Sequence, residues 1–204
     1  MSLEQKLRGV IRPLISTFDN GRFDPESMQR VAAENGRVIL LDGDEQQVNA
    51  EFVLGFNGEW NFLSEPLMEE IIEFAPSLGQ DGKKILVGTT AKNLPSTKRL
   101  SKLAQKVGVD AIVLAPEYQE QLLPYDFVAQ IARSVDLPIV IYVNSHATEN
   151  RHFPPGQYSR LAYDFPEKVV GVKVSTGTMT DFQEYSIVHG LEYGQKSSFL
   201  LGNE

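Results

Sequence analysis

Near its carboxyl end the chain carries the run Val169-Val170-Gly171-Val172-Lys173-Val174-Ser175, from which the fold can be worked out. Its small and β-branched residues predict a β-strand. Because side chains alternate along a strand, we expect Val170, Val172 and Val174 to share one face. Gly171, Lys173 and Ser175 then share the other face. The valine face is suited to packing under helices, and the opposite face carries a single amine.

Lys173 has two interpretations on this strand. A lysine in a mostly buried strand loses hydration, so its pKa is expected to fall and its neutral amine becomes available as a nucleophile. In the alternative, the side chain extends from the strand end and keeps its amine in water. The strand by itself leaves both interpretations open.

Strand-like and helix-like segments alternate from residue 83 onward. Strands are predicted at Lys84–Gly88, Ala111–Ala115, Pro138–Asn144, Val169–Ser175 and Ser198–Gly202. Helices are predicted at Leu94–Val107, Pro124–Val135, Pro155–Tyr163 and Thr180–Gly190. Strands separated by helices imply parallel pairing through right-handed crossovers.

The first quarter of the chain is less regular. A first strand is predicted at Gly9–Thr17, and a helix at Asp24–Glu34 with Asp24 as N-cap and Pro25 at its first position. Two short strands, Val38–Leu41 and Phe52–Leu54, are separated by a polar loop over 42–47. With Phe52–Leu54 as its second strand, the sheet has seven strands.

An α/β fold of the (β/α)8 or TIM-barrel type is favoured over an open doubly wound sheet, although the alternation is compatible with both. The dinucleotide fingerprint and the phosphate-binding loop are both missing. Polar residues fall in or just beyond the carboxyl halves of the predicted strands, where barrel active sites are built. These residues are Thr89, Thr90, Tyr118, Tyr142, Asn144, Lys173 and Ser175. We expect one domain over residues 1–204.

Composition narrows the classes of function. The 204 residues include no cysteine, which excludes disulfides, thiolate catalysis and zinc–thiolate sites. The net charge is −8 and no basic cluster stands out, so neither nucleic acid nor a membrane is an expected partner. His146, His152 and His189 form no metal-binding pattern, and we expect neither a metal nor a cofactor. A cytoplasmic location is the default expectation.

Two further features could serve a reactive lysine. Tyr142 shares a strand face with Val140 and Asn144, and its hydroxyl could relay protons. Its alternative is a core tyrosine with one hydrogen bond. The turn from Gly55 to Gly58 can present backbone amides to a carboxylate, although most such turns are only turns.

In order and spacing, these segments resemble the dihydrodipicolinate synthase/N-acetylneuraminate lyase family of pyruvate-dependent class I aldolases, from about Gly9 to Gly202. The resemblance is carried by Gly9-Val10-Ile11-Arg12-Pro13-Leu14, Gly55-Phe56-Asn57-Gly58-Glu59, Val87-Gly88-Thr89-Thr90, Ala115-Pro116-Glu117-Tyr118, Pro138-Ile139-Val140-Ile141-Tyr142 and Gly171-Val172-Lys173-Val174-Ser175.

The resemblance implies a metal-independent Schiff-base lyase or aldolase built as a (β/α)8 barrel, in a dimer or tetramer of identical chains. Lys173 would attack pyruvate or another 2-keto acid, Tyr142 would relay protons, and an aldehyde would be the second substrate. Gly55, Phe56, Asn57 and Gly58 would bind the carboxylate, with Tyr118 and Ser175 also lining the substrate site.

The chain departs from the family pattern in several places. Phe56 and Asn57 replace two threonines of the family, Val174 replaces an aspartate, and Ala147 replaces the arginine that holds the second substrate of dihydrodipicolinate synthases. The last βα unit of the family is also expected to be missing from this sequence. The alternative function is therefore a non-catalytic member that binds a keto acid or an oligomer partner.

Overall fold

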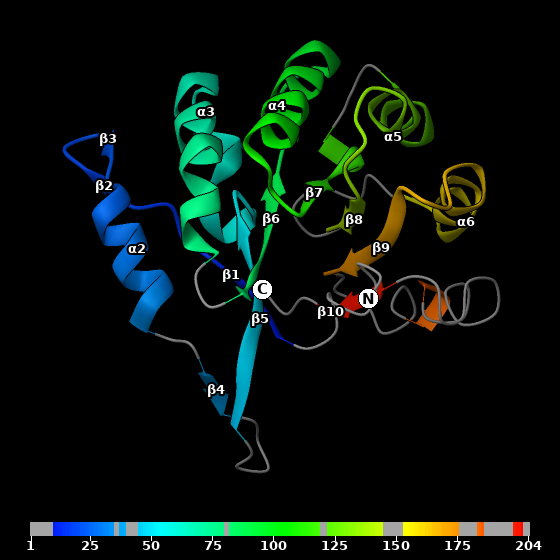
Figure 1. The fold of residues 1–204 in the computed structure, drawn as a ribbon. Helices are drawn as coiled ribbons and strands as arrows, with labels where there is room; N and C mark the ends of the chain where they lie inside the picture. Colours follow the sequence, from blue (N-terminus) through cyan, green and yellow to red (C-terminus); the bar gives the residue numbers. More distant parts are fainter. Residues whose placement is uncertain are drawn as a thin grey trace.

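The molecule is organised around one curled sheet of parallel strands. The computed structural model describes residues 10–34, 37–39, 45–79, 82–118, 122–144, 153–175, 183–185 and 198–201. Strands follow one another in the order β1 (Val10–Pro13), β5 (Glu45–Val53), β6 (Lys84–Gly88), β7 (Ala111–Leu114), β8 (Ile139–Val143), β9 (Val169–Val174) and β10 (Ser198–Leu201). Within this order, each strand is parallel to the next (Figure 1). The predicted parallel order is thus confirmed.

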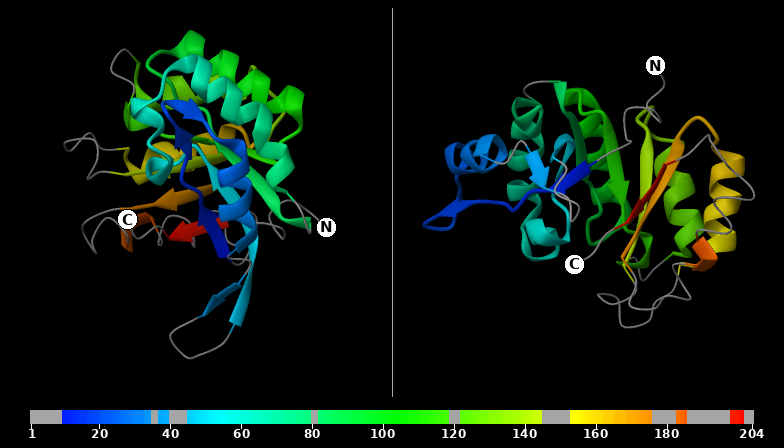
Figure 2. Two further views of the ribbon diagram at one scale, coloured as in Figure 1. Left: turned by 90° about the vertical axis from the view of Figure 1, so that its left-hand side faces the viewer. Right: turned by 90° about the horizontal axis from the view of Figure 1, so that it is seen from below.

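Helices cover the outer side of this sheet. They are α2 (Pro25–Glu34), α3 (Glu65–Phe74), α4 (Leu94–Val107), α5 (Pro124–Ala132) and α6 (Pro155–Asp164). In Figure 2 the strands form a curve and these helices lie outside it. Helices on one side of a curled parallel sheet define the predicted (β/α)-barrel fold and exclude the doubly wound alternative, which has helices on both faces. In the described part of the chain, β1 and β10 each pair with one strand only.

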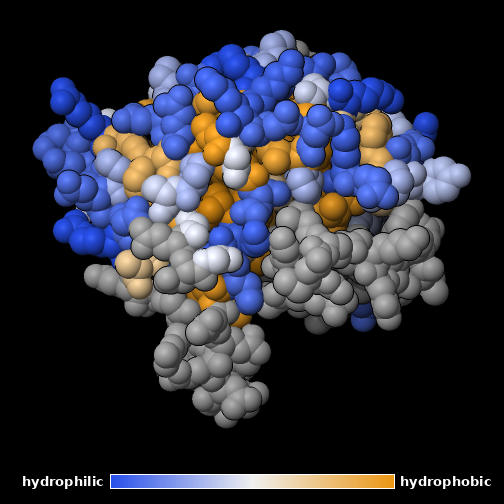
Figure 3. Space-filling model, in the orientation of Figure 1, coloured by the Kyte–Doolittle hydropathy of each residue, from blue (hydrophilic) through white to orange (hydrophobic). Residues whose placement is uncertain are grey.

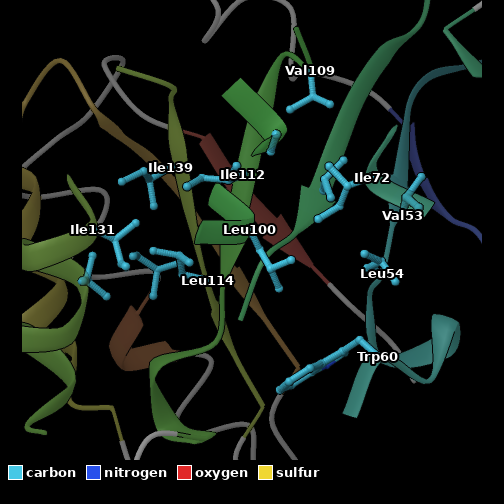
Figure 4. Close-up of a cluster of buried hydrophobic side chains, with 14 of the residues drawn as sticks. Val53, Leu54, Trp60, Ile72, Leu100, Val109, Ile112, Leu114, Ile131 and Ile139 are labelled. Atoms are coloured by element: carbon cyan, nitrogen blue, oxygen red, sulfur yellow. The ribbon is translucent and has the colours of Figure 1, made fainter. Parts of the chain in front are cut away.

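A large apolar core fills the space between sheet and helices. Ile112, Leu114 and Ile139 from the strands meet Leu100 and Ile131 from the helices, and all five are fully buried (Figure 4). Charged and polar side chains cover the outer surface of the helices (Figure 3). This burial of apolar area is the main force that holds helices to sheet.

No helix in the described residues is long and apolar enough to cross a membrane.

A second, smaller core lies on the inner side of the sheet. It contains Ala50, Phe52, Leu86, Ala111, Val113, Ala115, Val140, Tyr142 and Val170. The prediction that Val170 shares a face with Val172 and Val174 is therefore wrong, because those two belong to the outer core. The physical reason is a register shift opposite Ile139 and Val140, which interrupts the alternation at the start of β9.

Several element boundaries also differ from the predictions. β1 ends at Pro13 rather than Thr17, and α5 ends at Ala132, where the amide of Ser134 bonds to the Ile131 carbonyl instead of continuing the helix. Residues 45–47, predicted as loop, belong to β5, which pairs antiparallel with β4 (Arg37–Ile39). Most of the predicted helix Thr180–Gly190 lies outside the described residues.

The predicted cap of α2 is confirmed. The Ser27 amide donates to the Asp24 carboxylate over 3.0 Å. Hydrogen bonds from the side chain and backbone of Ser27 lower the pKa of this carboxyl. A short hairpin precedes the cap, formed by β2 (Phe18–Asp19) and β3 (Arg22–Phe23), and was not predicted.

Gly88, the last residue of β6, lies directly against the backbone of the neighbouring strand. A Cβ at this position would be 2.1 Å from the carbonyl oxygen of Leu54. Leu54 has a positive φ of 56°, the left-handed conformation by which the chain leaves β5. The close approach of these two strand ends requires a residue without a side chain.

We predict that Gly88→Ala lowers the free energy of unfolding by about 3 kcal/mol, because the added methyl group must displace backbone. Gly156→Ala is the matched control, since a Cβ there meets nothing within 4 Å and the residue lies in α6. It should be neutral or stabilising by about 0.5 kcal/mol. Urea unfolding followed by circular dichroism measures both, and equal stabilities would contradict this packing.

Candidate active site

The structure brings Lys173 and Tyr142 together on the inner side of the sheet. They occupy paired positions of β8 and β9, and the Lys173 Nζ lies 3.8 Å from the centroid of the Tyr142 ring. The phenol is 2% exposed, whereas Lys173 is only partly buried. In its protonated form, the ammonium over the face of an aromatic ring is attracted by the ring quadrupole, so this contact positions the Lys173 side chain.

Ser175 gives the amine a second contact. The Lys173 Nζ donates a hydrogen bond to the Ser175 Oγ over 2.9 Å. The Ser175 amide in turn donates to the Val143 carbonyl over 2.8 Å, which ties the end of β9 to the end of β8. The predicted residues Lys173, Tyr142 and Ser175 therefore form one connected group.

The Tyr142 hydroxyl is held by a neighbour on its own strand face. The Asn144 Nδ2 donates to this hydroxyl over 3.0 Å, and Asn144 is itself 4% exposed. The backbone amide of Asn144 donates to the carboxylate of Glu117 over 2.8 Å. The same carboxylate accepts the amide of Phe153 over 3.1 Å.

Glu117 is a candidate functional residue that the sequence analysis did not single out. It is 2% exposed although it carries a charge, and it lies in the short 3-10 helix η5 (Pro116–Tyr118) just beyond β7. Buried carboxylates are rare unless they are hydrogen-bonded, and this one accepts two backbone amides. The sequence signal that could have identified Glu117 is its place directly after a buried strand and Pro116.

The turn predicted to bind a carboxylate forms the 3-10 helix η1 (Phe56–Gly58). The Gly58 amide donates to the Gly55 carbonyl over 3.0 Å, so it is used within the turn. A 3-10 helix does not use its first amides, which here belong to Phe56 and Asn57. Of the predicted backbone donors, the Gly58 amide is therefore excluded, and the amides of Phe56 and Asn57 are available.

Phe52 lies between this turn and Tyr142, the phenol beside Lys173. Its ring meets the Tyr142 ring edge-to-face, with centroids 6.4 Å apart and an interplanar angle of 89°. A Cβ on Gly55 would lie 2.7 Å from the same Phe52 ring, so the turn and the ring are in close contact. The side chain of Phe56 packs against this inner core.

Several predicted residues lie wholly or partly outside the described part of the chain. Tyr118 ends η5, but its side chain lies outside the described residues. His146, His152, His189 and Ala147 also lie outside them. Among the residues that are described, no group of three His, Asp or Glu side chains could hold a metal ion.

An amine and an oriented phenol thus lie together near the carboxyl ends of parallel strands, and the η1 turn packs through Phe52 against the same phenol ring. Active sites of (β/α)-barrel enzymes are built at this end of the strands. The model of the Dihydrodipicolinate synthetase family matches residues 6–192, and the chain belongs to this family. Among curated relatives, the probable 2-dehydro-3-deoxy-D-pentonate aldolase YjhH of Escherichia coli is 30% identical over 83% of this chain and 54% of its own length. A 4-hydroxy-tetrahydrodipicolinate synthase of Thermotoga is 31% identical, covering 97% of this chain and 64% of its own.

Solved structures agree with the fold. YagE of Escherichia coli, a family member in complex with pyruvate, superposes with a TM-score of 0.83 at 23% identity, covering 96% of this chain and 63% of YagE. The dihydrodipicolinate synthase of Bacteroides thetaiotaomicron has a TM-score of 0.77 at 29% identity, covering 95% and 62%. This chain therefore spans between about half and two-thirds of the length of these relatives.

Proposed function

We propose that the chain carries the active site of a lysine Schiff-base lyase or aldolase that acts on pyruvate or another 2-keto acid without a metal. The observation that carries this proposal is the Lys173 amine, which lies over the Tyr142 ring at paired positions of β8 and β9. Membership in a family with aldolase and synthase relatives supports it. We also propose that the active unit is a cytoplasmic dimer or tetramer of identical chains.

The chemistry follows from an amine and an acid in one site. The neutral Lys173 amine adds to the keto carbon, and a proton moves to the former carbonyl oxygen to give a carbinolamine. Tyr142 then donates its proton to that hydroxyl, which leaves as water, and an iminium remains. The iminium withdraws electrons from the adjacent carbon–carbon bond during cleavage. In the reverse direction its enamine attacks an aldehyde.

The substrate carboxylate is proposed to bind at the η1 turn. The amides of Phe56 and Asn57 are the donors there, and the exposed Asn57 side chain can add a third. A carboxylate held by several amides is fixed in place without a cationic side chain. The keto carbon can then be presented to Lys173 in one orientation.

The second substrate is proposed to be an uncharged aldehyde. Tyr142 and Ser175, which contact Lys173, and Asn144, which contacts Tyr142, are all uncharged. Ala147 stands where related synthases carry an arginine. The name of the relative YjhH points to a 2-keto-3-deoxy sugar acid, whose cleavage between the third and fourth carbons gives pyruvate and a hydroxyaldehyde. We propose a substrate of this class.

The second candidate function is binding without catalysis. Phe56 stands where family members carry a threonine, and its packing against the inner core leaves no hydroxyl at that position. Such a member would bind a keto acid or an oligomer partner and form no covalent adduct. Chemical trapping separates the two functions.

We predict that borohydride treatment with pyruvate adds one reduced pyruvyl group to the chain, located on Lys173 by peptide mass spectrometry. Lys173→Met should abolish the adduct, because no other amine is paired with Tyr142 in the described residues. Lys102→Met, an exposed residue of α4, is the control and should keep it. An intact folded chain that gains no adduct would favour binding without catalysis.

We predict that Asn57→Ala raises the pyruvate concentration for half-maximal trapping by about tenfold, the loss of one hydrogen bond to a charged group. The trapping rate at saturating pyruvate should change little, because Asn57 binds the carboxylate and takes no part in the proton transfer. Asn57→Asp, close to isosteric, should weaken binding further through charge repulsion. Equal half-saturation in all three proteins would contradict carboxylate binding at η1.

We predict that neutral hydroxyaldehydes, but not aspartate semialdehyde, are condensed with pyruvate. The measurement is consumption of each aldehyde with formation of a new 2-keto acid, followed by mass spectrometry. The reason is that Ala147 stands where related synthases carry an arginine, so an acidic aldehyde would lack that cationic partner. A preference for aspartate semialdehyde would overturn the proposed substrate class.

A further inference from the structure

The Tyr142 hydroxyl has an amide partner two residues further along the chain. Asn144 Nδ2 donates to this oxygen over 3.0 Å, and both residues are at least 96% buried. Because the amide donates, the phenol oxygen is the acceptor, and the phenol proton can be directed toward another group. Donation to a phenol oxygen also stabilises the negative charge that remains when the proton leaves.

Asn144 is itself fixed by a buried charge. The Glu117 carboxylate accepts the backbone amides of Asn144 and Phe153 over 2.8 Å and 3.1 Å, so it joins η5 and β8 to the segment that leads into α6. Hydrogen bonds to an ionised acceptor are stronger than neutral ones. Glu117 therefore sets the place of the Asn144 backbone, from which the side chain reaches Tyr142.

Phe56 explains why the Tyr142 hydroxyl needs a hydrogen-bond partner such as Asn144. Phe56 stands at one of the two positions where the family carries a threonine, so the hydroxyl that a threonine would offer to the phenol is missing there. Phenylalanine cannot hydrogen-bond to the Tyr142 oxygen, so a different group must orient the phenol. Asn144 makes a hydrogen bond to the Tyr142 oxygen, from the same side of the sheet.

We propose that Asn144, positioned by Glu117, replaces the lost threonine contact and assists proton transfer from Tyr142, an inference that rests on the proposed function. When Tyr142 donates its proton to the carbinolamine hydroxyl, the carbon–oxygen bond breaks and water leaves. The phenolate that remains is stabilised by the Asn144 N–H, and it regains a proton from solvent. Asn144 and Glu117 are positioning residues, because neither gives a proton to the substrate.

The test is a double-mutant cycle read on the rate of borohydride-trapped adduct with saturating pyruvate. Asn144→Ala should slow adduct formation by about tenfold or more. Glu117→Gln, whose single acceptor oxygen cannot serve both amides, should slow it by about fivefold. In the Asn144→Ala background, Glu117→Gln should have less than about a twofold effect, because both act through one hydrogen bond.

The control removes an equally buried hydrogen bond away from the lysine. The Thr97 Oγ1 accepts the Ala91 amide over 3.0 Å and is fully buried, so Thr97→Val should lower stability without changing the trapping rate of the folded protein. The proposal would be overturned if the double variant were slowed by the product of the two single effects. It would also be overturned if the single variants formed the adduct at the wild-type rate.

A spectroscopic readout is independent of the reaction. With tyrosine labelled by 13C at Cζ, the Tyr142 resonance, assigned by its loss in Tyr142→Phe, should shift in Asn144→Ala and Glu117→Gln but not in Thr97→Val. If wild type forms no adduct, the proposed function fails and this resonance decides the orientation of the phenol. A resonance that stays in place in both variants would overturn the role of Asn144 and Glu117.

Discussion

The parallel pairing of β8 with β9 is the constraint on which the proposed site depends. It sets Tyr142 beside Lys173, so that the amine lies 3.8 Å from the centre of the phenol ring. The Ser175 amide closes the pairing by bonding to the Val143 carbonyl. Because a shift of one residue would turn each side chain to the other face of the sheet, amine and phenol can meet in this register only.

The two cores and the contacts at the strand ends stabilise the β8–β9 register. The outer core binds the helices to one side of the sheet, and the inner core surrounds Tyr142 with apolar side chains. The strand ends are joined by specific contacts: Gly88 lies against the Leu54 carbonyl, and Glu117 accepts amides from two separate segments. These contacts lie at the end of the strands where Lys173 is found, which couples the packing of the barrel to the geometry of the site.

The sequence predicted the features that follow from local patterns. Regular apolar spacing predicted α4 with its correct bounds, and β-branched runs predicted β8 and β9, the strands that carry Tyr142 and Lys173. The inward side of Val170 was missed, because a register shift arises from pairing with β8 and leaves no local signal. Glu117 was missed for a similar reason: its amide partners, Asn144 and Phe153, lie 27 and 36 residues further along the chain. Helix α3 was also not predicted.

The central claim is that Lys173 forms an imine with a 2-keto acid, and hydrogen exchange at the pyruvate methyl group tests it most directly. An imine of pyruvate converts to its enamine by losing a methyl proton, and in D2O the carbon regains a deuteron. Proton NMR of pyruvate should therefore show loss of the methyl signal with the wild-type chain and none above the buffer rate with Lys173→Met. Wild-type protein that is folded, yet exchanges no faster than buffer, would contradict the account.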